Sequence, residues 1–275
     1  MSVKIKGLTN LKNVIIKSLA GGSVVPPVDP GTDWYSVDTY TGTSMSTEWR
    51  SSCWSPLLNK FLIIGYSNID NIIPLCAVSS DGFNWDIAQM PPSDSTFWYD
   101  VCWSPTQNQF LAVGSKSYAV STNGLDWTAF PITIDNVVTN TASMQAVTYS
   151  EDLAKYFAVG YDDTNGKNIL SSLNGNTWHW EGGAKYVDFR SVMWDSNKGL
   201  MVAGGDNFAG GIVPGDGTVA IFTSVDGTFW EAKSSAGFAV NECSAVFTNL
   251  VAVGNTDTQT TPMNVLVSTD GMIWD

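Results

Sequence analysis

The sequence has few of the side chains that most often carry out catalysis. Among its 275 residues there is one histidine, His179, and the 13 basic residues include only two arginines, Arg50 and Arg190. With one histidine and no Cys-x-x-Cys pair, a zinc site of the usual ligand pattern is not expected. No Ser-His-Asp set and no phosphate-binding glycine loop can be recognised. The sequence therefore predicts no metal, no cofactor and no catalytic set of these familiar kinds.

Charge and long apolar runs are also scarce. Charged residues make up 14% of the chain, and no stretch approaches the roughly 20 apolar residues that a membrane-spanning helix needs. The formal net charge of the chain is −13, and because all 26 acidic residues but only 9 of the 13 basic residues follow residue 28, the body of the protein is strongly acidic. Such a body repels phosphate backbones and anionic lipid. We expect neither nucleic acid as a partner nor membrane insertion.

What the sequence does have is a repeated turn. Asp or Asn followed by Gly is a strong signal for a tight hairpin, because both residues tolerate positive φ, and a nearby Ser hydroxyl can bond the backbone of the turn. Each copy is therefore predicted to join two strands, the second of which starts at Trp. The pattern Ser-x-Asp/Asn-Gly-x-x-Trp occurs five times, at residues 79–85, 121–127, 172–178, 224–230 and 268–274.

Two further landmarks recur between these turns. An aromatic residue is predicted to open the first strand of each repeat, and an apolar strand ending in Gly follows it. Four strands in about 45 to 50 residues match one blade of a β-propeller. Cys53 and Cys102 occupy equivalent places in two repeats, which predicts buried apolar positions rather than a disulfide or a metal site. The aromatic landmarks are Trp54, Trp103, Tyr149, Trp194 and Phe247.

The two ends of the body complement each other. The last copy stops at Trp274 with no fourth strand after it, whereas residues 31–49 read as a fourth strand without the first three. We therefore predict an all-β fold over residues 29–275, a five-bladed propeller closed by its N-terminal strand. This closure places Trp34 beside Trp274 and leaves no exposed sheet edge.

Residues 1–28 differ from the rest. They contain four lysines and no acidic residue, have apolar residues at helical spacing, and end in the Pro26-Pro27 pair. We interpret them as a basic amphipathic arm that docks the body onto a larger assembly. A flexible terminus is the alternative.

The repeated turn resembles the Asp-box of sialidase-like propellers, Ser-x-Asp-x-Gly-x-x-Trp, although here the residue between Asp and Gly is missing in every copy. The chain is also similar to propeller repeats of tailed-bacteriophage virion and tail proteins, and in blade number to five-bladed lectins. The resemblance implies the fold and a place in a virion, with residues 1–28 binding other virion proteins. A sialidase clamps its substrate with three arginines, and two cannot build that site.

In propellers, ligands usually meet the face where the chain crosses from one blade to the next. We locate these crossings five and four residues before each aromatic landmark. In the fifth repeat, this count from Phe247 gives Glu242 and Cys243. Aromatic side chains at these crossings would stack on a sugar while polar groups bond its hydroxyls. Alternatively, the aromatic side chains would only fill one end of the central channel of the propeller. The candidate ligand-binding residues are Trp49, Arg50, Trp98, Tyr99, Gln145, Phe189 and Arg190.

From these observations we expect a non-enzymatic virion protein, associated with a phage tail or capsid, that presents its propeller to a host glycan or receptor. Two alternatives stay open. One is a glycoside hydrolase that uses paired carboxylates, with Asp100, Asp188 and Glu242 as candidates near the crossings. The other is a scaffold that binds protein partners.

Overall fold

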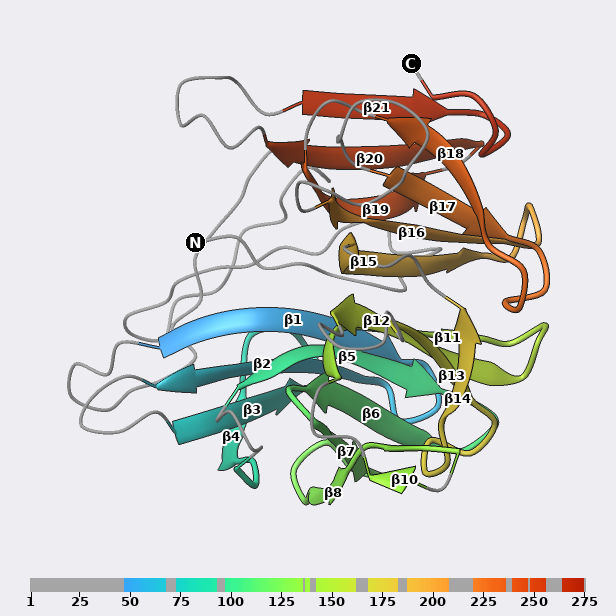
Figure 1. Cartoon of the computed structure of the whole chain (residues 1–275). Coiled ribbons are helices and arrows are strands. Elements are labelled where there is room, and N and C mark those ends of the chain that lie inside the picture. Colours follow the sequence, from blue (N-terminus) through green and yellow to red (C-terminus); the bar gives the residue numbers. More distant parts are fainter. Residues whose placement is uncertain are drawn as a thin grey trace, which may run out of the picture.

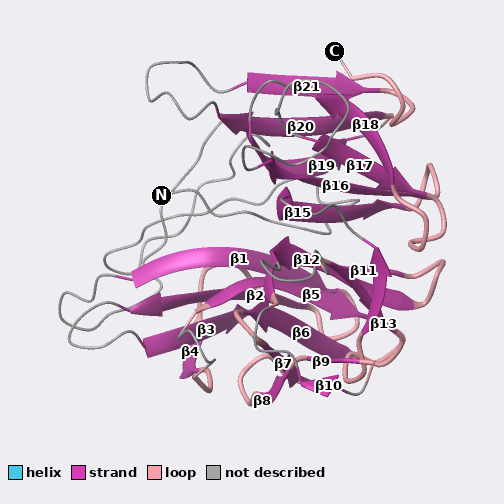
Figure 2. Ribbon diagram, in the orientation of Figure 1, coloured by secondary structure: helices cyan, strands magenta, loops and turns pink. Residues whose placement is uncertain are grey.

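A computed structural model describes residues 47–67, 73–92, 97–135, 137–138, 142–161, 168–182, 187–207, 220–235, 239–246, 248–255 and 264–274. Within these ranges β-strands are the regular elements, so the predicted all-β class is confirmed (Figure 2). No helix in the described part of the chain is long and apolar enough to cross a membrane. The predicted arm, residues 1–28, and the predicted closing strand with Trp34 lie outside the described residues.

Five antiparallel sheets follow one another in chain order (Figure 1). The first contains β1 (Thr47–Ser55), β2 (Lys60–Ser67), β3 (Ile73–Ser79) and β4 (Asp86–Gln89). The second contains β5 (Trp98–Ser104), β6 (Gln109–Gly114), β7 (Ser117–Ser121) and β8 (Thr128–Pro131). The third contains β11 (Ser143–Ser150), β12 (Lys155–Tyr161), β13 (Ile169–Ser172) and β14 (His179–Gly182). The fourth contains β15 (Val187–Asp195), β16 (Leu200–Asn207), β17 (Ala220–Ser224) and β18 (Glu231–Ser235). The fifth contains β19 (Ala239–Val246), β20 (Asn249–Asn255) and β21 (Asn264–Ser268).

The first strands of successive sheets lie next to one another. β1 contacts β5, β5 contacts β11, β11 contacts β15, and β15 contacts β19. These five strands form an inner row, and the later strands of each sheet extend outward from it. The sheets therefore follow one another side by side around this row, as expected for blades.

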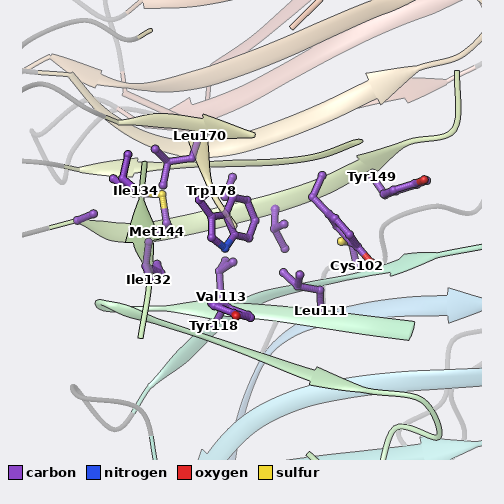
Figure 3. Packing of buried hydrophobic residues seen from close by; sticks show 14 residues of the cluster. Cys102, Leu111, Val113, Tyr118, Ile132, Ile134, Met144, Tyr149, Leu170 and Trp178 are labelled. Carbon is purple, nitrogen blue, oxygen red and sulfur yellow. The ribbon is translucent and has the colours of Figure 1, made fainter. Parts of the chain in front are cut away.

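The hydrophobic core is divided among the gaps between neighbouring sheets. Figure 3 shows one such layer, in which Cys102 and Leu111 of the second sheet meet Met144 and Trp178 of the third. Equivalent layers lie between the first and second, third and fourth, and fourth and fifth sheets. Trp178 is fully buried, and truncating a core Trp of this kind costs about 3–5 kcal/mol. Sheet-to-sheet packing is therefore a major source of stability.

The aromatic landmarks do not open the first strands, and that prediction is wrong. β1 begins at Thr47 and β5 at Trp98, well before Trp54 and Trp103. Each strand contains a β-bulge upstream of its aromatic residue. The extra residue breaks the alternation of buried and exposed side chains, which hid the beginning of the strand in the sequence.

The five repeated turns share one hydrogen-bond pattern. In the first, the N–H of Gly82 donates to the Ser79 hydroxyl at 2.8 Å, and the N–H groups of Phe83 and Asn84 donate to Asp81 Oδ1 at 2.8 Å. The other four turns repeat these bonds, with Asn123 or Asn174 replacing Asp in two of them. The predicted strand, turn and strand are present in the first four copies, but the turn is wider than a tight hairpin, only its Gly has positive φ, and the second strand begins one residue after the Trp.

Four of the turn glycines also pack against a side chain of the preceding sheet, namely Gly124, Gly175, Gly227 and Gly271. A Cβ on Gly227 of the fourth sheet would collide with the Phe157 ring of the third, and one on Gly271 would collide with Leu200 of the fourth. By contrast, a Cβ on Gly82 of the first sheet would meet no atom within 4 Å. The turns after the first sheet therefore help to hold consecutive sheets together.

All four cysteines are buried, and none of these described residues forms a disulfide, in agreement with the predicted apolar positions. Burial raises the pKa of the Cys76 thiol to about 11. A small sheet of β9 (Thr133–Ile134) and β10 (Val137–Val138) was not predicted. It lets Ile134 pair with Trp178 and join the same core layer.

Candidate functional site

All five inner strands carry a β-bulge at the same place. The pairing register shifts across Arg50 in β1, and at the equivalent residue of β5, β11, β15 and β19. A bulge leaves one residue out of the ladder and re-aims its side chain, and bulges are frequent beside active sites. The bulged residues are Arg50, Tyr99, Gln145, Arg190 and Asn241.

Four of these five are predicted site residues, so the structure places that part of the predicted set at equivalent positions. In the fifth repeat the count from Phe247 was wrong by two residues. The residue that pairs like the other landmarks is Ala245, opposite Leu250. The aromatic residue is absent there, so the sequence landmark shifted the count from Asn241 to Cys243.

The residues just before the bulges point into the core. Trp98 is 1% exposed and Phe189 is 0% exposed. The indole N–H of Trp98 donates to the Pro91 carbonyl at 3.0 Å. Their rings fill the spaces between sheets, so the expectation that they offer flat faces to a sugar is corrected. Trp49 is partly buried.

The residues just after the bulges bond one sheet to the next. Asp100, 3% exposed, accepts the Ser51 hydroxyl of the first sheet at 2.5 Å and the Val147 N–H of the third at 2.8 Å. The Ser191 hydroxyl donates to Glu242 Oε1 at 3.2 Å. Asp100 and Glu242, both considered as catalytic carboxylates, thus lie in a belt of hydrogen bonds between neighbouring sheets.

On the first two sheets, the bulged residues belong to what we call the aromatic cluster: Glu48, Arg50, Tyr66, Phe97 and Tyr99. The Tyr66 hydroxyl donates to Glu48 at 2.5 Å, and Arg50 Nη2 donates to the same hydroxyl at 3.3 Å. The Arg50 guanidinium lies 5.2 Å from the Tyr66 ring centre and 5.8 Å from that of Phe97. These distances fit cation–π contacts.

On the fourth and fifth sheets, they belong to what we call the acidic cluster: Asp188, Arg190, Asp206 and Asn241. Asp188 and Asp206 stand directly opposite each other on β15 and β16. Arg190 Nη2 donates to Asp206 at 3.0 Å, its Nε lies 3.7 Å from Asp188 Oδ2, and its Nη1 donates to Asn241 at 2.9 Å. One guanidinium group therefore holds both carboxylates.

The two carboxylates have different environments. Burial raises the pKa of Asp188; the Arg190 charge opposes this rise, and the Asp206 charge adds to it. Asp188 Oδ1 is shielded from solvent and has no hydrogen-bond partner in the described structure. Asp206 instead accepts a charged hydrogen bond. Pairs of carboxyl groups with such unequal environments are suited to the roles of acid and base.

The sequence pointed to Asp188 and Arg190 separately and missed Asp206. Asp206 follows the Gly204–Gly205 end of the predicted apolar strand. Counting antiparallel pairs back from Trp194 and Met201 would have placed it opposite Phe189, because only the bulge at Arg190 brings it opposite Asp188. The lone histidine, His179, is exposed on β14, 3.0 Å from Asp135. It takes no part in either cluster.

No protein-family model and no curated protein sequence matches the chain. Among solved structures, a protein of unknown function from Dyadobacter fermentans matches with a TM-score of 0.56 and 15% identity, covering 86% of this chain and 82% of its own. A nidogen/laminin complex matches at 0.55 and 8% (82% and 76% covered), and a gluconolactonase from Xanthomonas campestris at 0.53 and 9% (83% and 74% covered). The fold is a β-propeller.

This comparison corrects one prediction. The expectation that the protein is not an enzyme is wrong, because the solved propellers of similar fold include enzymes such as the gluconolactonase. At identities of 8–15% the likeness establishes the propeller fold. The virion and Asp-box resemblances receive no support from it.

Proposed function

We propose that this propeller is a glycoside hydrolase whose reacting carboxyl groups are Asp188 and Asp206. The observation that carries the proposal is their placement directly opposite each other across β15 and β16, around one arginine. Residues paired in this way have Cβ atoms about 4.5–5.5 Å apart. Retaining glycosidases hold their two carboxyl groups about 5–5.5 Å apart.

The raised pKa of Asp188 assigns it the role of acid. It donates its proton to the glycosidic oxygen while the Asp206 carboxylate attacks the anomeric carbon, so the bond to the leaving sugar breaks and a glycosyl ester forms. Water then gives a proton to the Asp188 carboxylate and attacks the same carbon, which releases Asp206. One water is consumed, both groups regain their starting forms, and the anomeric configuration is retained.

Arg190 is a positioning residue in this scheme. Its bonds to Asp206 and Asn241 fix the guanidinium group between the fourth and fifth sheets. A gluconolactonase among the propellers of similar fold supports a sugar-derived substrate.

The test uses p-nitrophenyl monosaccharides, neutral hexasaccharides and glucono-δ-lactone. We expect hydrolysis of at least one glycoside with retention, seen by proton NMR, and a loss of about 10³-fold in Asp188→Asn and Asp206→Asn. Asp126→Asn, in an exposed turn of the second sheet, is the matched control and should act like wild type. Full activity in either site variant, or cleavage of the lactone alone, would overturn the proposal.

We further propose that the ring has five blades and that residues 31–46, the part of the predicted closing strand 31–49 that precedes β1, add the fourth strand beside β21. Support comes from the outer strand of the fifth sheet, where Val265 and Val267 are 54% and 38% exposed to solvent in the described structure. Hydrogen exchange tests this. The β21 amides that do not bond to β20 should be protected in the full chain and lose protection in a chain that starts at residue 47. Equal exchange in both chains would contradict closure.

The predicted location in a virion, with residues 1–28 bound to other virion proteins, stands as a proposal that rests on the basic arm. A protein lacking residues 1–28 is expected to fold and to be absent from purified particles. Incorporation at the wild-type level would contradict it.

A further inference from the structure

The aromatic cluster is not used by the proposed reaction, yet it lies at the same bulge of the inner strands. Its bonds fix the side chains firmly, because Glu48 accepts from Tyr66 and Tyr66 accepts from Arg50. Tyr66 is 7% exposed and forms the buried base of the cluster. Phe97 and Tyr99 are partly exposed and stacked, with ring centres 6.4 Å apart and planes at 23°.

This combination suits a sugar ring. A partly exposed aromatic ring provides a flat apolar surface, and the exposed Arg50 and Glu48 provide a hydrogen-bond donor and acceptor at its edge. Arg50 is already in contact with two rings and the Tyr66 hydroxyl. It is therefore held in place before any ligand arrives, which lowers the entropy cost of binding.

The bulged residues also form a continuous row. From Tyr99 of the second sheet, the next bulged residue is Gln145 of the third, followed by Arg190 of the fourth. Packed sheets lie about 10 Å apart, and one whole sheet separates the sheets of Tyr99 and Arg190, so the row is longer than a single sheet spacing. A single sugar ring cannot span that length.

We propose that Arg50, Phe97 and Tyr99 form a non-reacting subsite and that the substrate is an uncharged oligosaccharide reaching from this subsite to Asp188 and Asp206. The inference rests on the proposed function and names its substrate class. The row offers no net positive charge to an anionic glycan, because the carboxylates of Glu48 and Asp206 balance the two arginines while Asp188 carries the acid proton, and both arginines already bond these acids or their partners. Like charges disfavour a uronic-acid ligand.

The experiment measures binding by calorimetry in the Asp206→Asn protein, with cellohexaose, maltohexaose, chitohexaose and the charged trigalacturonate as probes. Adding Tyr99→Ala should weaken binding of the recognised hexasaccharide about tenfold, as expected for loss of one stacking surface. Phe130→Ala is the matched control, because Phe130 stacks on Tyr118 at the same 23° but lies on the outer strand β8. It should bind like its parent.

Kinetics in the otherwise wild-type protein separates this inference from the proposed function. Tyr99→Ala should raise KM for the hexasaccharide about tenfold, so that kcat/KM for the hexasaccharide falls relative to kcat/KM for a p-nitrophenyl monosaccharide, whereas Phe130→Ala should leave this ratio at the wild-type value. Hexasaccharide binding through Tyr99 without cleavage supports the subsite while the hydrolase proposal fails. Equal hexasaccharide cleavage by wild type and Tyr99→Ala, absence of hexasaccharide binding, or preference for trigalacturonate overturns the subsite.

Discussion

The first and fourth sheets place an arginine at the same bulge and give it different partners. Arg50 meets the cross-strand pair Glu48 and Tyr66, whereas Arg190 meets Asp188 and Asp206. In the first sheet the one carboxylate is bonded by a phenol, and the arginine lies against aromatic rings. In the fourth, two carboxylates compete for one cation. The residue on the second strand, Tyr66 or Asp206, is therefore what distinguishes the surroundings of the two arginines, and the roles proposed for the two clusters rest on this difference.

The largest effect should come from copying the first sheet's pattern into the fourth. Asp206→Tyr replaces the second carboxylate with the phenol that the first sheet already accommodates at this position. Hydrolysis should fall by about 10³-fold or more, since the attacking group is lost. Glu48→Gln, which alters the first sheet instead, should change kcat less than threefold. Initial rates with the glycoside cleaved by wild type measure both, and a comparable loss in the two variants would remove the distinction between the clusters.

The hydrogen bonds between neighbouring sheets should also contribute unequally to stability at Asp100 and at Ser191. Asp100 bonds two other sheets, whereas Ser191 bonds only the fifth. Asp100→Ala should lower the free energy of unfolding by about 2–4 kcal/mol, because the buried Val147 N–H loses its partner, and Ser191→Ala by about 1 kcal/mol. Urea denaturation followed by Trp fluorescence compares them. The reverse order would show that Asp100 is not the main connection.

The turn glycines of the two sheets should also respond unequally. Gly82 and Gly227 both have positive φ, so alanine costs about 1–2 kcal/mol at either. Only at Gly227 does the new methyl group collide with a neighbouring ring, that of Phe157, which adds about 1–3 kcal/mol. Thermal unfolding should therefore separate Gly227→Ala from Gly82→Ala. Equal melting temperatures would mean that the turn of the fourth sheet does not pack on the third.

The turn aspartates of the first and fourth sheets, Asp81 and Asp226, should respond alike to acid. Backbone hydrogen bonds in the turns lower the pKa of both Asp81 and Asp226 to about 2. Because the folded pKa lies below the unfolded value near 3.8, each contributes stability above pH 4 that is lost as the pH falls towards 2. Asp81→Asn and Asp226→Asn, which copy Asn123 and Asn174, should reduce this acid loss by similar small amounts. Acid titrations of Trp fluorescence measure it, and a clear inequality would contradict the shared turn geometry.

The repeat made much of the fold predictable. The Ser and Asp or Asn of each turn bond the backbone locally, so their spacing is retained in every copy and marks each sheet in the sequence. The bulges were not predictable, because one unpaired residue in a strand has no characteristic residue type or spacing that a sequence would show. The clusters depend on register between strands. Asp206 meets Asp188 only through pairing across a turn, and Phe97 meets Tyr66 only through packing between sheets.

The resemblance to Asp-box proteins could not guide the functional prediction, because it described the outer turns; the non-enzymatic prediction rested instead on the basic arm and on the absence of a recognisable catalytic set. Those turns lie at the far end of each sheet from the bulged residues in the hydrogen-bond ladder. The similarity of these turns to the Asp-box therefore indicates how each sheet is built, and it does not indicate which side chains the bulges of the inner strands expose. Burial of Trp98 and Phe189 was likewise hidden, since an aromatic residue reads the same in a sequence whether it faces solvent or core.

Because a bulged residue stands outside the ladder, its side chain can change without altering any strand pairing. The described strands thus have five such places in a row, filled by Arg, Tyr, Gln, Arg and Asn. Under the proposed function, substitutions there would change ligand specificity while the scaffold stays intact. A library randomised at these five codons alone would sample recognition with little cost in folding.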